Sequence, residues 1–73
     1  MLEINPAQQY ASSMDSVTLI NRFLADPPSY MSEQDVADTI QRNVKHLEIM
    51  VGKDFWTDED LTPFTDAIAA GQT

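Results

Sequence analysis

The chain has 73 residues, no cysteine, and twelve acidic against four basic residues, which gives a net charge of −8 at pH 7. These totals exclude disulfides and thiolate metal ligands, and the negative field opposes direct binding to nucleic acid or to an anionic membrane. Because no apolar run approaches the roughly 20 residues that a bilayer requires and the first residues lack the basic start of a signal peptide, we expect a small cytoplasmic protein without a cofactor.

The N-terminal residues 1–13 are polar and contain few branched apolar side chains. Asn5 followed by Pro6 is a possible helix start, with Asn5 as the N-cap and Pro6 at the first helical position, although a pair of serines further on offers a competing cap. Because chain termini commonly fray, we expect residues 1–13 to form a flexible arm and residues 14–73 to form a single helical domain.

The first expected helix covers residues 14–25. It ends before a pair of prolines, because the residue before a proline is pushed out of the helical region. Pro27 and Pro28 predict a stiff, extended connector to the next helix. The sequence Pro27-Pro28-Ser29-Tyr30 also matches the Pro-Pro-x-Tyr ligands of WW domains, but a connector explains the same residues more simply.

The strongest helical signal in the chain covers residues 33–51. Its apolar residues recur at the spacing of one stripe on a 3.6-residue period, and they are Val36, Ile40, Val44, Leu47 and Val51. Ser32 is the expected N-cap, with Asp35 as its capping-box partner. Gly52 is expected to close the helix in a left-handed conformation.

The last expected helix covers residues 58–70, with Thr57 as N-cap and Asp60 as its capping-box partner. Pro63 fits poorly at the sixth position of a helix, so we expect one turn, a step, and a new helix that starts at Pro63 and ends at Gly71. One shared core should hold the large aromatic side chains Phe23, Phe55, Trp56 and Phe64. The predicted fold is thus an all-α bundle of three helices with a flexible N-terminal arm.

The back of the middle helix carries a candidate partner-binding patch. At about 100° per residue, Ile49 lies opposite the apolar stripe, and basic side chains surround it. The predicted partner-binding residues are Arg42, Lys45, His46, Ile49 and Lys53. An apolar centre ringed by charged side chains is typical of a small binding surface. The alternative is that another part of the chain covers Ile49, which would then belong to the core.

Catalytic and metal-binding interpretations have less support. His46 is the single histidine and has no carboxylate at helical spacing to orient it, and the chain has neither a nucleophile elbow nor a glycine-rich phosphate loop. The acidic cluster of residues 54–60 lacks the ligand spacing and the glycine of an EF-hand, and it suits a helix N-terminus instead. We therefore expect a binding protein, not an enzyme, with no catalytic, cofactor-binding or metal-binding residues.

Residues 42–71, with the sequence RNVKHLEIMVGKDFWTDEDLTPFTDAIAAG, resemble small acidic proteins of tailed bacteriophages. This resemblance implies a functional class and no individual protein. Phages encode many small acidic proteins that bind and redirect host machinery, prominently RNA polymerase. We therefore expect a monomeric regulator in the host cytoplasm that docks on a protein complex, with inhibition or modulation of host RNA polymerase as the first hypothesis. The alternatives are a virion structural or assembly component, which would self-associate, and a DNA-mimic inhibitor, which would fill a basic groove.

Overall fold

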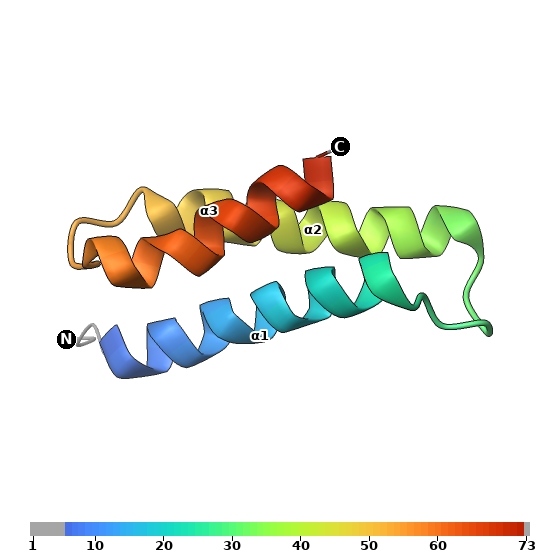
Figure 1. Ribbon diagram of the computed structural model, residues 1–73, viewed down its shortest axis with the longest axis horizontal. Helices are drawn as coiled ribbons and strands as arrows, with labels where there is room; N and C mark the ends of the chain where they lie inside the picture. The colour runs from blue at the N-terminus through green and yellow to red at the C-terminus, as the bar shows by residue number, and fades with distance from the viewer. Residues whose placement is uncertain (1–5, 73) are drawn as a thin grey trace, which may run out of the picture.

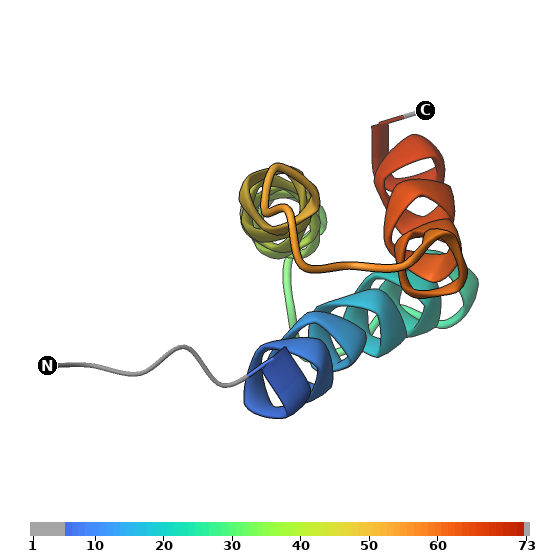
Figure 2. The ribbon, with the colours of Figure 1, turned by 90° about the vertical axis from the view of Figure 1, so that its left-hand side faces the viewer.

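Three helices and the two segments that connect them make up residues 6–72, the part of the chain that this computed structural model describes (Figure 1). They are α1 (Pro6–Ala25), α2 (Glu33–Val51) and α3 (Asp58–Gln72). Consecutive helices run in opposite directions, and in the end view of Figure 2 they stand at the corners of a triangle. Each helix contacts the other two. The predicted all-α bundle of three helices is therefore confirmed.

The first helix begins earlier than expected. The sequence predicts a start at residue 14, whereas α1 begins at Pro6. Residues 6–13 are therefore helical and are not part of a flexible arm, while residues 1–5 of the expected arm lie outside the described residues. Pro6 occupies the first helical position, where its missing N–H has no intrahelical partner to lose.

An aromatic cluster at one end of the bundle holds the extended part of α1. The ring of Tyr10 has its centroid 6.4 Å from that of Trp56 and 5.9 Å from that of Phe64. Trp56 lies in turn 5.1 Å from Phe64 and 4.5 Å from Phe55. Such contacts stabilise a polar segment that would be a marginal helix alone. Phe23 packs against the same apolar core, but about 20 Å further along α1 than Tyr10.

The core between the helices takes apolar side chains from all three. The buried ones are Val17, Ile20, Ile40, Val44, Leu47, Phe64 and Ala67. They include the three central positions of the stripe predicted for α2, whereas its end positions Val36 and Val51 are half-buried. Ser13 and Ser16 of α1 are buried as well.

Both predicted N-caps form. In α2, the Asp35 backbone N–H donates to Ser32 Oγ at 3.1 Å. In α3 the capping box is reciprocal, because the Asp60 N–H donates to Thr57 Oγ1 at 3.1 Å and the Thr57 N–H donates to Asp60 Oδ2 at 3.3 Å. Each cap satisfies backbone donors that the first turn of a helix leaves free.

The C-terminal end of α2 closes in a different way from the one predicted. Gly52 has φ −76° and ψ −11°, which is right-handed and not left-handed. Its N–H donates to the Ile49 carbonyl at 3.2 Å, so a tightened last turn replaces the left-handed residue. The Trp56 indole Nε1–H donates to the Met50 carbonyl at 2.7 Å, which ties the following loop to the helix end.

α3 is one continuous helix, so the predicted step at Pro63 and the predicted end at Gly71 are both wrong. Pro63 deprives only the Glu59 carbonyl of its helical partner, and Glu59 is exposed, where water can replace it. Gly71 remains helical because α3 comes very close to α2 there. A Cβ on Gly71 would lie 2.5 Å from Val44 Cγ2, and Gln41 Nε2 donates to the Gly71 carbonyl at 2.9 Å.

Candidate protein-binding surfaces

The predicted patch lies on the solvent side of α2. Ile49 is 60% exposed, and Arg42 and Lys45 are exposed beside it. At about 100° per residue these three positions fall within roughly 60° around the helix axis. No other part of the described chain covers Ile49, so it does not belong to the core. We call Arg42, Lys45 and Ile49 the outer patch.

The two other predicted patch residues are placed differently. Lys53 lies beyond the end of α2, where its backbone N–H donates to the Met50 carbonyl at 3.0 Å. His46 is half-buried, and its Nε2 is buried without a hydrogen-bond partner within residues 6–72. The structure therefore brings together three of the five predicted residues on one exposed face, with His46 turned partly into the bundle.

The two prolines predict an extended connector between α1 and α2, but the connector is not fully extended. The Met31 N–H donates to the Pro28 carbonyl at 3.3 Å, which makes a turn. Tyr30 at the tip of this turn is 88% exposed, whereas Pro28 is half-buried. The turn lies in the connector that reverses the direction of the chain between α1 and α2 (Figure 1).

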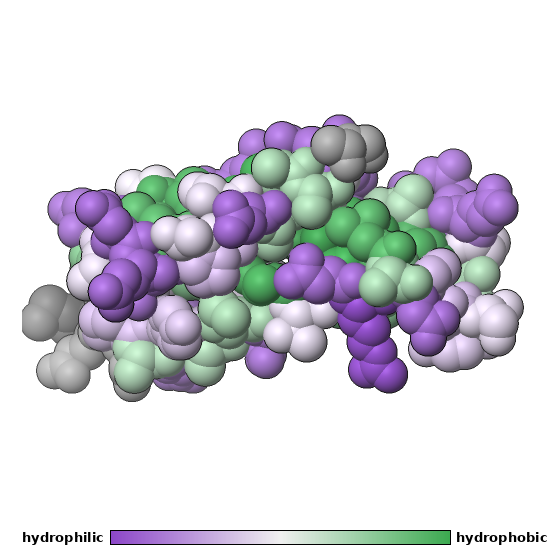
Figure 3. All heavy atoms as spheres, in the orientation of Figure 1, coloured by the Kyte–Doolittle hydropathy of each residue, from purple (hydrophilic) through white to green (hydrophobic). Residues whose placement is uncertain are grey.

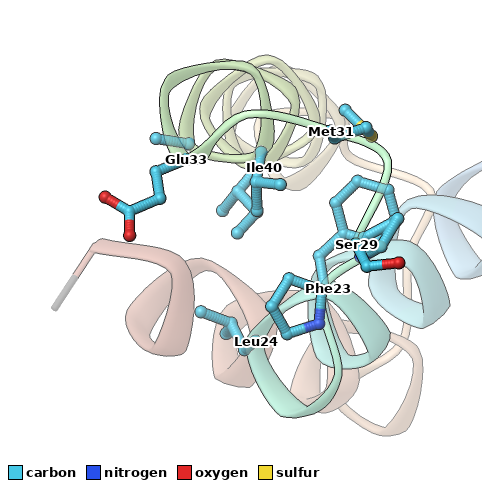
Figure 4. Close-up of a pocket in the computed structure, with 10 residues that line it drawn as sticks. Phe23, Leu24, Ser29, Met31, Glu33 and Ile40 are labelled. Carbon is cyan, nitrogen blue, oxygen red and sulfur yellow. The ribbon is translucent and has the colours of Figure 1, made fainter.

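The sequence does not predict an apolar groove that lies between the end of α1, the connector and the start of α2. Its volume is about 400 Å³. The apolar side chains that line it include Phe23, Leu24, Met31, Val36, Ala37 and Ile40. In Figure 4, Leu24 and Ile40 point toward one another across the groove, and the Glu33 carboxylate stands at its margin. We call this feature the α1–α2 groove.

Unequal helix lengths explain the groove. α1 and α2 have 20 and 19 residues, whereas α3 has 15. At 1.5 Å per residue, α3 is about 6–8 Å shorter than its neighbours. It ends before it reaches the connector, and Figure 3 shows apolar surface exposed beside that end, over α1 and α2. The sequence does show that Val36 and Ile40 belong to the apolar stripe of α2. It does not show that α3 leaves these two side chains uncovered at the groove.

Within residues 6–72, no group of three or more His, Cys, Asp or Glu side chains is placed to hold a metal ion. None of the three helices is both long and apolar enough to cross a membrane. The outer patch and the α1–α2 groove are two exposed features that combine apolar side chains with charged ones.

These two surfaces lie on opposite sides of α2. Ile49 of the outer patch and Ile40 in the groove are nine residues apart, which at about 100° per residue places them half a turn from each other. One side is apolar and concave, whereas the other presents a single exposed apolar side chain between two cations. No protein-family model, no curated protein and no solved structure matches this chain.

Proposed function

We propose that this protein is a small protein-binding regulator that docks on a larger macromolecular complex and acts by binding, without catalysis. The observation that supports this proposal is the α1–α2 groove. A domain of this size buries only about 60% of the surface of its unfolded chain and is marginally stable, so an apolar groove of about 400 Å³ left open is a loss of stabilising contacts. Exposed apolar surface of this kind marks interaction sites in soluble proteins.

The charge of the protein adds to this proposal. A net charge of −8 raises the association rate with a basic protein surface and disfavours acidic partners. The groove would supply the apolar anchor, because buried apolar contacts at the centre of an interface carry most of the binding energy. The outer patch offers a second contact on the opposite side of α2, so that one small domain can touch two elements of a complex.

The first partner to test is bacterial RNA polymerase, in the cytoplasm of a phage-infected host. The resemblance of residues 42–71 to small phage proteins supports this choice. In this proposal the protein works as a monomer, and it either blocks a functional surface of the polymerase or competes with another protein for it.

The test combines binding to purified bacterial RNA polymerase with transcription from a linear template. Three variants separate the surfaces: Ala37→Arg places a long cation at the groove, Ile49→Asp places a charge in the outer patch, and Ala11→Arg is a control at an exposed helical position outside both. We expect the intact protein to bind and to reduce transcription, Ala37→Arg to weaken binding about tenfold or more, and Ala11→Arg to have little effect.

Two results contradict the proposal. If the polymerase does not bind at micromolar concentration, this partner is wrong. If sedimentation shows that the protein associates with itself and that Ala37→Arg abolishes the association, the groove joins copies of the chain, as expected of an assembly component. For each variant, circular dichroism shows whether the helical content is unchanged, so that loss of binding is not confused with unfolding.

A further inference from the structure

We infer that the α1–α2 groove binds an amphipathic helix of a partner protein, with an apolar stripe flanked by Lys or Arg side chains. The inference rests on the proposed function, because it takes the partner to be a protein, and it adds the conformation and charge of the segment that is bound.

The position of α3 indicates that the occupant is a helix. α3 lies on α1 and α2 as far as Gly71, where an added Cβ would approach Val44 Cγ2 at 2.5 Å, Ile40 Cγ2 at 3.3 Å and Ile20 Cγ2 at 3.5 Å. Ile40 also lines the groove. The groove is therefore the continuation of the surface on which α3 rests, after α3 has ended (Figures 1 and 3). A segment of the same shape fills it by the same packing of ridges into grooves.

The lining of the groove selects an apolar stripe. Leu24 is 46% exposed at its α1 side, whereas Ile40 at its floor is 7% exposed. Helices that bind in such grooves present apolar anchors at positions i, i+3, i+4 and i+7. The groove has a volume of about 400 Å³, so side chains of a partner can enter it and the contact is not merely flat.

The charges around the groove select basic flanks. Glu33 is the one charged side chain among the groove's lining residues. Arg22 and Asp26, of opposite charge, line the adjoining hollow beside the connector. Arg42 and Lys45 lie on the opposite side of α2, together with Asp35 and Asp38, so the charge at the groove is that of Glu33 within a protein of net charge −8. A second copy of this chain is disfavoured as occupant, because two molecules of charge −8 repel each other.

The experiment measures the binding of synthetic peptides of roughly 15 residues, about four helical turns, to the complete protein by fluorescence anisotropy. The first peptide has a leucine stripe with lysine flanks, the second has the same stripe with glutamate flanks, and the third has the composition of the first in scrambled order. We expect the first to bind about tenfold or more tightly than either of the others, with an affinity that falls as salt is raised.

Variants of the protein locate the site. Ala37→Arg, at an exposed position that lines the groove, should weaken binding of the lysine-flanked peptide about tenfold or more. Ala11→Arg makes the same change of charge about 20 Å from Leu24 along α1, and it should change the affinity less than about twofold. Glu33→Gln should weaken binding about threefold and reduce its dependence on salt.

Several outcomes overturn the inference. If the scrambled peptide binds as tightly as the lysine-flanked peptide, the acidic surface attracts any cationic peptide. The same conclusion follows if Ala37→Arg and Ala11→Arg bind the lysine-flanked peptide with equal affinity. If the glutamate-flanked peptide binds as tightly as the lysine-flanked peptide, or more tightly, the basic charge assigned to the partner is wrong. If none of the peptides binds, the inference that the groove binds a helix is wrong. If the peptides fail but Ala37→Arg still prevents binding to the polymerase, this inference is wrong and the proposed function stands.

Discussion

The substitution Gly71→Ala tests how closely α3 approaches the rest of the bundle. The new Cβ would lie 2.5 Å from Val44 Cγ2 and 3.3 Å from Ile40 Cγ2, whereas carbon atoms in favourable contact are about 3.5–4.0 Å apart. Both neighbours are buried β-branched side chains on a helix, and such side chains have one strongly preferred rotamer. The clash must therefore be relieved by moving α3 away from α2.

Two opposing contributions decide how much Gly71→Ala changes the free energy of unfolding. Overpacking of a core costs typically about 1–3 kcal/mol, while replacing glycine by alanine inside a helix gains about 1 kcal/mol of helix propensity. Because the approach to Val44 Cγ2 is only 2.5 Å, we expect the clash to cost about 2–3 kcal/mol, which leaves a net loss of about 1–2 kcal/mol in the free energy of unfolding. For a domain of this size, that loss lowers Tm by roughly 5–15 °C.

Urea and thermal unfolding followed by circular dichroism measure this loss. Gly52→Ala is the matched control, because Gly52 has a right-handed conformation and an added Cβ would meet only the Ile49 carbonyl oxygen, at 3.3 Å. Its effect should stay within about 1 kcal/mol. In a Val44→Ala background, Gly71→Ala should lose most of its destabilising effect. If Gly71→Ala raises Tm in the otherwise unchanged chain, the close packing of α3 on α2 is refuted.

Three further predictions concern α1 and the loop before α3. Tyr10→Ala removes the ring contacts to Trp56 and Phe64 and should cost about 1–3 kcal/mol with a loss of helical signal, whereas a flexible arm would show no change in a urea melt. Trp56→Phe removes the indole donor to the Met50 carbonyl and should cost about 1–3 kcal/mol by the same measurement. Ser13→Ala should stabilise by about 1 kcal/mol, seen as a higher Tm, because the Ser13 hydroxyl is buried without a partner in the described structure.

Local signals in the sequence were sufficient where the physical cause is itself local. Ser32 and Thr57 are recognisable as N-caps because the bonds they accept come from backbone N–H groups three residues away. The stripe of α2 is likewise visible in its spacing alone.

Predictions failed where contacts distant in the sequence decide the structure. The sequence predicts a start of α1 that is too late, because residues 6–13 are polar. What holds them in the helix is the contact of the Tyr10 ring with rings more than forty residues further on. The sequence predicts a helix end at Gly71, whereas the structure shows that a side chain at this position would collide with a methyl group of Val44 on another helix. Neither cause can be seen in the neighbouring sequence.

The two candidate surfaces differ in the same way. The exposure of Ile49 follows from the periodicity of α2, and the structure agrees with it. The α1–α2 groove depends on where α3 stops relative to the other helices and on the turn in the connector that lines it, and neither is encoded by a local pattern. Sequence periodicity thus identifies which side chains are apolar on a helix, but not which of them the fold leaves uncovered.

The aromatic cluster provides the protein with an optical probe of its own. Trp56 is the only tryptophan of the chain, and it contacts rings from α1, α3 and the loop between α2 and α3. Its emission therefore reports whether these elements are docked, independently of the helical signal in circular dichroism. Because the groove lies at the opposite end of the bundle, a ligand that binds there should leave the tryptophan spectrum unchanged, whereas unfolding shifts it. The tryptophan emission thus checks, without a label on the protein, that the bundle stays folded while a ligand is titrated into the groove.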